Sequence, residues 1–150
     1  MIRVVPDTNV IISGMIIPRG NTRNIINLAL ARKIILYGNQ ETFNEFCKKI
    51  RKNKFFKYLK KQYYSPDKVI DDYCSFIYMI NPLEAPSNCN IVIDDPDDNK
   101  FIKVAIASKS RIIVSGDEHL KKLKKHKNII IVSPGRFIRN WIASNNNKLF

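Results

Sequence analysis

The chain has 150 residues, with 26 lysine and arginine residues against 13 aspartate and glutamate residues, and a formal net charge of +13. This length suits one domain with its own apolar core. No linker-like stretch divides the chain, so we expect a single domain over 1–150 with a frayed tail from about 144. The charge favours a polyanionic partner, nucleic acid first, ahead of an anionic membrane surface or an acidic protein. No apolar run approaches the ~20 residues that span a bilayer, and the first residues lack the apolar stretch of a signal peptide, so we expect a cytoplasmic protein.

The first third of the chain alternates apolar runs with helical patterns. Ile2–Pro6 is typical of a buried strand, and a loop then leads into a helix at 25–31, where apolar residues recur at near-helical spacing. A second buried strand is expected at 34–37, followed by a helix at 42–50 that carries Glu45. The order is strand, helix, strand, helix.

The remaining two thirds continue this alternation. Residues 54–79 have a helical pattern, and Ser65 followed by Pro66 predicts the start of the second arm of a helical hairpin. After it we expect an extended run at 91–93, a helix at 101–107, a strand at Ile112–Val114, a helix at 117–125, a strand at Ile129–Val132 and a last helix after Ser133 and Pro134. Repeated strand–helix units predict an α/β domain, with a central, mainly parallel sheet of about five strands and helices on both faces.

Four carboxylates occupy positions where such a fold forms its sites, beyond the carboxyl ends of the strands. Asp7 and Asp117 each follow a strand, Glu45 lies on the helix after the second strand, and Asp98 opens the helix after 91–93. Carboxylates held close together repel one another, and a cation relieves that repulsion. Hard oxygen ligands with few histidines favour Mg²⁺ or Mn²⁺, bound as one or two ions. Each residue also has a simpler interpretation, as a turn or helix cap or, for Glu45, as the partner of a nearby lysine.

The chain resembles the PIN-domain nucleases, in particular the toxin components of prokaryotic toxin–antitoxin systems. The resemblance rests on residues 7–14 (Asp-Thr-Asn-Val-Ile-Ile-Ser-Gly), Glu45, residues 95–101 (Asp-Pro-Asp-Asp-Asn-Lys-Phe), residues 114–117 (Val-Ser-Gly-Asp) and residues 132–134 (Val-Ser-Pro), in that order along nearly the whole chain.

This resemblance implies a metal-dependent ribonuclease with a PIN-like fold, whose acidic ligands match Asp7, Glu45, Asp98 and Asp117. It also implies a small antitoxin protein as a partner. Asn9 and Ser115 look like supporting polar residues. Among the four neighbouring aspartates 94, 95, 97 and 98, the family pattern favours Asp98, with Asp95 as the second choice.

Basic residues supply candidate contacts to RNA. Those between 48 and 64 interleave with aromatic residues, which could stack on unpaired bases. The candidate phosphate contacts are Lys54, Lys57, Lys60, Lys61, Lys121 and Lys122.

Our leading hypothesis is an endoribonuclease that hydrolyses RNA phosphodiesters as a toxin. The alternatives are a non-catalytic RNA-binding module of the same fold, and an RNA-processing nuclease that is not a toxin. The net charge argues against a nucleotide-binding regulator of the receiver-like kind. The oligomeric state stays open, with a homodimer as one option.

Overall fold

The computed structural model describes residues 1–52, 54–55, 57, 65–81, 99–117, 120–121 and 125–146. Within these ranges the main elements are β1 (Ile2–Pro6), α1 (Thr8–Ile16), α2 (Asn21–Leu30), β2 (Ile34–Gly38), α3 (Gln40–Ile50), α5 (Pro66–Phe76), β3 (Ile77–Met79), α6 (Asn99–Ala107), β4 (Ile112–Val114), β5 (Lys125–His126), β6 (Ile129–Val132) and α8 (Pro134–Asn146). No helix in the described ranges is long and apolar enough to cross a membrane.

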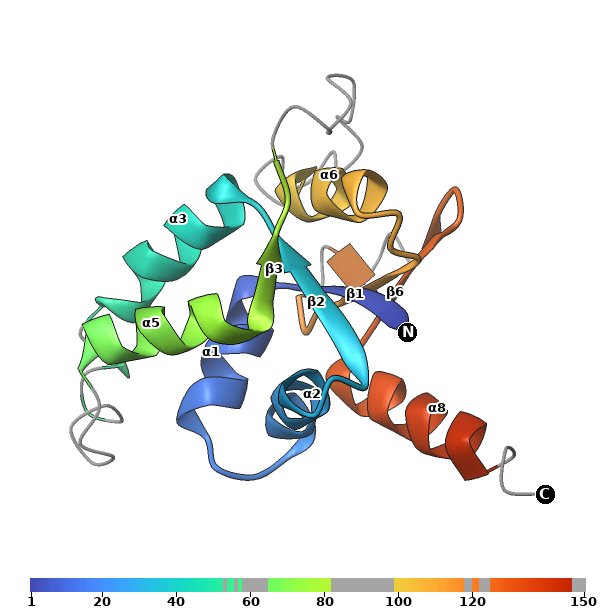
Figure 1. Cartoon of the computed structure of the whole chain (residues 1–150), viewed down its shortest axis with the longest axis horizontal. Coiled ribbons are helices and arrows are strands. Elements are labelled where there is room, and N and C mark those ends of the chain that lie inside the picture. The colour runs from blue at the N-terminus through green and yellow to red at the C-terminus, as the bar shows by residue number, and fades with distance from the viewer. Residues whose placement is uncertain are drawn as a thin grey trace.

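The strands form one sheet in the order β3-β2-β1-β4-β6-β5 (Figure 1). Five of them run parallel, and β5 adds an antiparallel edge to β6. The chain builds outward from β1 in one direction through β2 and β3, and in the other through β4 and β6. The direction of the crossovers therefore reverses between β1 and β4, which is where open parallel sheets form their binding sites.

Apolar side chains fill both faces of this sheet, as the alternation along each strand requires. Val4 joins the core shared with α1, α2, α3, α5 and α8, whereas its neighbour Val5 joins the core shared with α6. The same division separates Val114 from Ile113 on β4. Figure 1 shows α6 on one side of the sheet and α1, α2 and α8 on the other. The predicted α/β architecture with helices on both faces is confirmed.

Side-chain caps mark where several helices begin. The side chain of Asn39 accepts a hydrogen bond from the backbone N–H of Thr42, and the Thr42 hydroxyl accepts one from the backbone N–H of Asn39, a reciprocal capping box at the start of α3. The predicted cap before Pro66 is confirmed, because the Ser65 hydroxyl accepts a hydrogen bond from the backbone N–H of Lys68.

The loop expected between β1 and the first helix is wrong, because Thr8–Ile16 forms α1. Six of its nine residues are buried, so the helix lacks the polar face that creates a helical period in the sequence. Val10, Ile11 and Ile12 are β-branched and intrinsically weak helix formers, but burial against the rest of the core outweighs that preference.

The expectation of helix throughout 54–79 is wrong at its end, since α5 stops at Phe76 and the next three residues form β3. The apolar residues at 76–80 contain no proline or glycine to mark the change, and the pairing of Ile77 with Leu36 of β2 decides it. The first arm of the hairpin lies largely outside the described residues, where only Lys54, Phe55 and Lys57 are described, each helical.

Two further boundaries differ from expectation. The helix expected at 117–125 is described as helical only at Leu120 and Lys121, and Lys125 belongs to β5, which pairs with β6 across the turn at Lys127 and Asn128. At the other end of the chain, α8 continues to Asn146, so residues 144–146 are part of this helix. The extended run expected at 91–93 lies outside the described residues.

Candidate active site

Asp7 stands at the point where the sheet topology reverses. Its backbone N–H donates to the carbonyl oxygen of Val114 at 2.9 Å, which continues the pairing of β1 with β4 by one residue. Its carboxylate caps α1, accepting a hydrogen bond from the backbone N–H of Val10 at 2.8 Å through Oδ1. The other oxygen, Oδ2, accepts a hydrogen bond from the hydroxyl of Ser115. The residue is only 4% exposed, so its carboxylate is held in a fixed orientation.

Burial raises the pKa of the Asp7 carboxyl, even though the hydrogen bonds from Ser115 and Val10 and the charge of Lys49 act in the opposite direction. The negative charge of Asp117 raises this pKa further. A buried carboxylate beside a second carboxylate is stabilised by a nearby cation.

Ser115 links the Asp7 carboxylate to the backbone of Asp117. It follows β4, is completely buried, and its backbone N–H donates to the carbonyl oxygen of Val132 at 3.0 Å. Its hydroxyl donates to Asp7 and accepts a hydrogen bond from the backbone N–H of Asp117 at 2.9 Å. The serine thereby positions the Asp117 backbone while it orients the Asp7 side chain.

Glu45 approaches the same strand ends from α3. Its Oε2 accepts a hydrogen bond from the Thr8 hydroxyl at 2.6 Å, and Thr8 is the residue after Asp7. The ammonium groups of Lys49 and Lys100 lie 3.1 Å from Oε1 and 3.5 Å from Oε2. Burial alone would raise the pKa of Glu45, but the hydrogen bonds from Thr8 and Lys49 and the charges of both lysines lower it on balance. Glu45 is therefore an ionised carboxylate that two lysines neutralise.

The described part of the chain brings Asp7, Glu45, Ser115 and Asp117 to one edge of the sheet. Asp98 and Asp95 lie outside the described residues, although α6 starts at Asn99, directly after Asp98. Asn9 is exposed on the first turn of α1, where it lines a groove of about 330 Å³ together with Ile12, Ile16, Lys54 and Phe55, among others. It makes no hydrogen bond with the carboxylates in the network described above.

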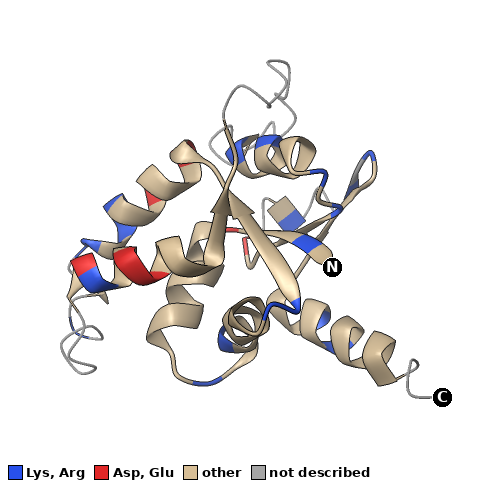
Figure 2. Ribbon diagram, viewed as in Figure 1, with Lys and Arg blue, Asp and Glu red and all other residues tan. Residues whose placement is uncertain are grey.

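The candidate RNA contacts are only partly described. Lys54 lies 4.9 Å from the centroid of the Phe55 ring, and Lys57 is exposed. The backbone N–H of Lys121 donates to the carbonyl oxygen of Asp117, so this lysine follows the site by one helical turn. Lys60, Lys61 and Lys122 lie outside the described residues. Figure 2 shows basic residues over many elements, with acidic residues gathered on α3, on α5 and at the centre of the sheet.

The sequence did not single out Thr8 and Lys100 as site residues. Thr8 could have been found from its place between Asp7 and Asn9 in the recognised motif. Lys100 gives a weaker signal, because a lysine after an acidic segment looks solvent-exposed. Lys49 was considered as a partner for Glu45, and the structure contains that ion pair.

The residues present fit a hard divalent cation. Among the described residues no three histidine, cysteine, aspartate or glutamate side chains gather closely enough to enclose an ion. The acidic side chains at this end of the sheet are those of Asp7 and Asp117, which follow strands, and of Glu45 on α3. Carboxylate oxygens are the ligands that Mg²⁺ and Mn²⁺ prefer. A buried carboxyl with a raised pKa is a further feature that such an ion would relieve.

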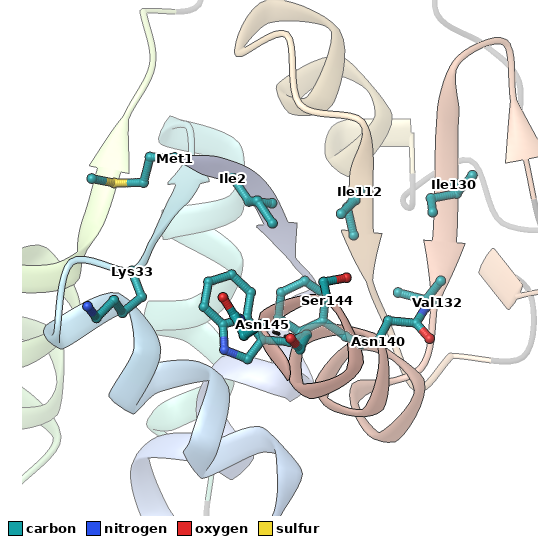
Figure 3. Close-up of a pocket in the computed structure, with 11 residues that line it drawn as sticks. Met1, Ile2, Lys33, Ile112, Ile130, Val132, Asn140, Ser144 and Asn145 are labelled. Carbon is teal, nitrogen blue, oxygen red and sulfur yellow. Dashed lines mark hydrogen bonds between the residues drawn. The ribbon is translucent and has the colours of Figure 1, made fainter. Parts of the chain in front are cut away.

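A pocket at the opposite end of the strands, their amino-terminal end, contains none of these carboxylates. It has a volume of about 310 Å³ and lies between the amino ends of β1 and β4 and helix α8 (Figure 3). Its lining includes Ile2, Ile112, Phe137 and Trp141. The lining contains no aspartate or glutamate, so the pocket adds no ligand to the candidate site.

Comparison with known proteins identifies the family of this chain and supports its fold. Residues 3–119 match the family model of the PIN domain, which covers β1 to the segment after Asp117. The uncharacterized protein MJ1680 of Methanocaldococcus jannaschii is 38% identical over 123 residues, which cover 82% of this chain and 76% of that protein. A chain in the crystal structure of VapBC2 from Rickettsia felis, bound to a DNA fragment from their promoter, has a similar fold. Its TM-score is 0.58 at 15% identity, over 87% of this chain and 97% of that one. The chain belongs to the PIN-domain nuclease family.

Proposed function

We propose that this protein is a metal-dependent endoribonuclease in which Asp7, Glu45, Asp98 and Asp117 hold Mg²⁺ or Mn²⁺, as one or two ions. The observation that carries the proposal is the buried Asp7 carboxylate at the reversal point of the sheet, within electrostatic reach of Asp117. Asp98 enters through the family pattern, since it immediately precedes α6. When bound, the ion activates water and neutralises the charge that develops on the phosphate during hydrolysis.

The chain itself contributes the orientation of the ligands. Ser115 and the backbone N–H of Val10 fix both oxygens of Asp7, and Thr8 fixes one oxygen of Glu45. Ligands that are already oriented require little rearrangement when the substrate binds, which favours the transition state. We assign supporting roles to Ser115 and Asn9, and a secondary role to Asp95.

RNA is the proposed substrate because the chain carries a net charge of +13 and exposes basic residues near the site. Lys57 is exposed and Lys54 is paired with an aromatic ring, an arrangement that suits contact with a phosphate and an unstacked base. Lys121 is half-buried and follows Asp117 by one helical turn, and we include it as a further candidate phosphate contact. Lys60, Lys61 and Lys122, which lie outside the described residues, are proposed phosphate contacts from their place in the sequence.

A role as the toxin of a toxin–antitoxin pair is the most specific part of the proposal. It is supported by the resemblance to toxin components and by the fold shared with a chain of VapBC2. A small antitoxin protein would then be the partner. An RNA-processing nuclease that is not a toxin remains the alternative. Induced expression should arrest growth in the first case and leave growth unchanged in the second, with Asp7→Asn as the inactive control in both.

Cleavage of a mixed RNA pool by the purified protein tests the central proposal. We expect new 5′ and 3′ ends in Mn²⁺ or Mg²⁺, none in EDTA, and none with the Asp7→Asn or Asp117→Asn variants. RNA binding without cleavage in either metal would instead identify a non-catalytic RNA-binding module.

A further inference from the structure

Lys100 is buried to an extent that is unusual for lysine. Its side chain is 12% exposed, compared with 31% for Lys103, which lies one turn further along α6. A lysine is rarely buried to this degree unless it is paired, and here the partner is Glu45, 3.5 Å from the ammonium group. The ammonium also lies 5.6 Å from the centroid of the Phe101 ring.

The position of Lys100 on its helix is electrostatically unfavourable. It is the second residue of α6, and the N-terminal end of a helix carries a partial positive charge that repels a cation. Lys49 differs in this respect, because it lies in the last turn of α3, where cations are favoured, and pairs with Glu45 across one turn of the same helix. Charge pairing and a favourable helix position account for Lys49. The unfavourable helix position of Lys100 instead indicates a further role for that lysine.

The carboxylate of Glu45 is surrounded by three donor or cationic groups. Thr8 donates a hydrogen bond to Oε2, the Lys49 ammonium lies 3.1 Å from Oε1, and the Lys100 ammonium forms a longer ion pair with Oε2 at 3.5 Å. A divalent ion binds a carboxylate oxygen at about 2.0–2.1 Å in the case of Mg²⁺, much closer than any of these donors. The contact with Lys100 is the longest of the three, so it is the one that an incoming ion displaces most easily.

A displaced Lys100 would remain inside the site. Its stem is largely buried, so its ammonium group can move only a short way from Glu45. The group that enters the site with the ion is the phosphate of the substrate, an anion, and lysine binds phosphate as a compact point charge.

We propose that Lys100 is a phosphate-binding residue of the active site, whose ammonium group occupies the place of the divalent ion beside Glu45 until that ion binds. This inference rests on the proposed nuclease function and adds to it a residue that contacts the substrate. It makes two separate demands. Lys100 competes with the metal in the free protein, and it assists cleavage once the metal is bound.

Lys100→Met tests both demands, with Lys103→Met as the matched control, because Lys103 lies on the same helix and pairs with Glu41 of α3 at 3.9 Å, outside the site. Isothermal titration of the RNA-free protein with Mn²⁺ measures the competition. We expect Lys100→Met to bind Mn²⁺ roughly three to ten times more tightly than wild type, as expected when one unit charge is removed from a partly hydrated site. Lys103→Met should bind it like wild type.

Cleavage of a single-stranded RNA oligonucleotide at saturating Mn²⁺ measures the second demand. We expect kcat/KM of Lys100→Met to fall by about 100-fold or more, the usual effect of losing one group that stabilises transition-state charge, and Lys100→Arg to recover part of it. Unchanged Mn²⁺ affinity, or cleavage equal to wild type at saturation, would overturn the inference. Absence of metal-dependent cleavage in the wild-type protein would instead reject the proposed function itself.

Discussion

Two substitutions of Asp7 separate its role as a helix cap from its proposed role as a metal ligand. Asparagine caps a helix as well as aspartate does and keeps an oxygen for the backbone N–H of Val10. It also removes a buried charge whose raised pKa shows that ionisation is disfavoured in the fold. We therefore expect Asp7→Asn, without metal at pH 7, to unfold at or slightly above the wild-type temperature.

Asp7→Ala should behave differently. Loss of the cap costs about 1 kcal/mol. The buried hydroxyl of Ser115 loses its side-chain partner entirely, whereas in Asp7→Asn it can accept a hydrogen bond from the side-chain amide, and this loss costs roughly 1–3 kcal/mol. Relief of the buried charge offsets part of this, and a net loss of about 2 kcal/mol lowers the melting temperature by about 4–8 °C in a chain of this size.

Thermal unfolding followed by circular dichroism, in EDTA and in Mn²⁺, measures these effects. Bound metal at 100 times its Kd should stabilise the wild-type protein by about 2.7 kcal/mol, and both variants should lose most of that gain. The pH dependence adds a second check. Because the folded-state pKa of Asp7 is raised, its contribution to stability is present below the unfolded pKa and is lost as the pH rises through the folded value. Asp7→Asn should lack this loss. A full Mn²⁺-induced shift in Asp7→Asn, or equal destabilisation of both variants in EDTA, would refute the reasoning.

Three further predictions concern the core, an ionisable side chain and the RNA surface. Gly14→Ala should reduce the free energy of unfolding by about 1–3 kcal/mol in urea titrations, because the added Cβ would lie 2.6 Å from the carbonyl oxygen of Thr22. Gly116 has open space around it, so Gly116→Ala should leave the free energy of unfolding almost unchanged. Burial raises the pKa of Tyr73 to about 12. The stability of wild type relative to Tyr73→Phe should therefore be constant below about pH 10 and fall between pH 10 and about pH 12. A stability difference that does not change with pH over this range would contradict the prediction. A fourfold glutamine variant should flatten the salt dependence of RNA affinity by up to about 3 in logarithmic slope, and an unchanged slope would mean that this face does not bind RNA. The four residues are Lys54, Lys57, Lys60 and Lys61.

The strands were predictable because each central one is a short apolar run buried on both faces and followed by a polar residue. β1 and β6 match the expected bounds for this reason. Helix α1 was not predictable from periodicity, because it is buried on most sides and has no polar stripe. β3 and β5 were missed because their extended conformation depends on pairing with β2 and β6, which the residues themselves do not reveal.

The positions of the candidate ligands followed from the rule that sites form at the carboxyl ends of parallel strands. That rule brings Asp7 and Asp117 to one edge, where the structure has them bridged by Ser115. The rule does not predict which charged side chains on the helices, such as Lys100 on α6, lie at the same end of the sheet. The pairing of Lys100 with Glu45 joins two segments far apart in sequence, and only packing of α6 against α3 creates it.

The protein stabilises the carboxyl groups of Asp7 and Glu45 in two different ways. Asp7 is shielded by burial, two hydrogen bonds hold its oxygens, and its pKa is raised. Glu45 stays ionised because Thr8 and two lysines surround it, and its pKa is lowered. In both arrangements the protein's own groups fix the orientation of the carboxylate. Loading the ion should therefore exchange a lysine for a metal beside Glu45, with little change in the fold. It follows that metal-free protein should give the same far-ultraviolet circular dichroism as metal-bound protein, and that a large change in this spectrum on adding Mn²⁺ would show that the carboxylates are not preorganised.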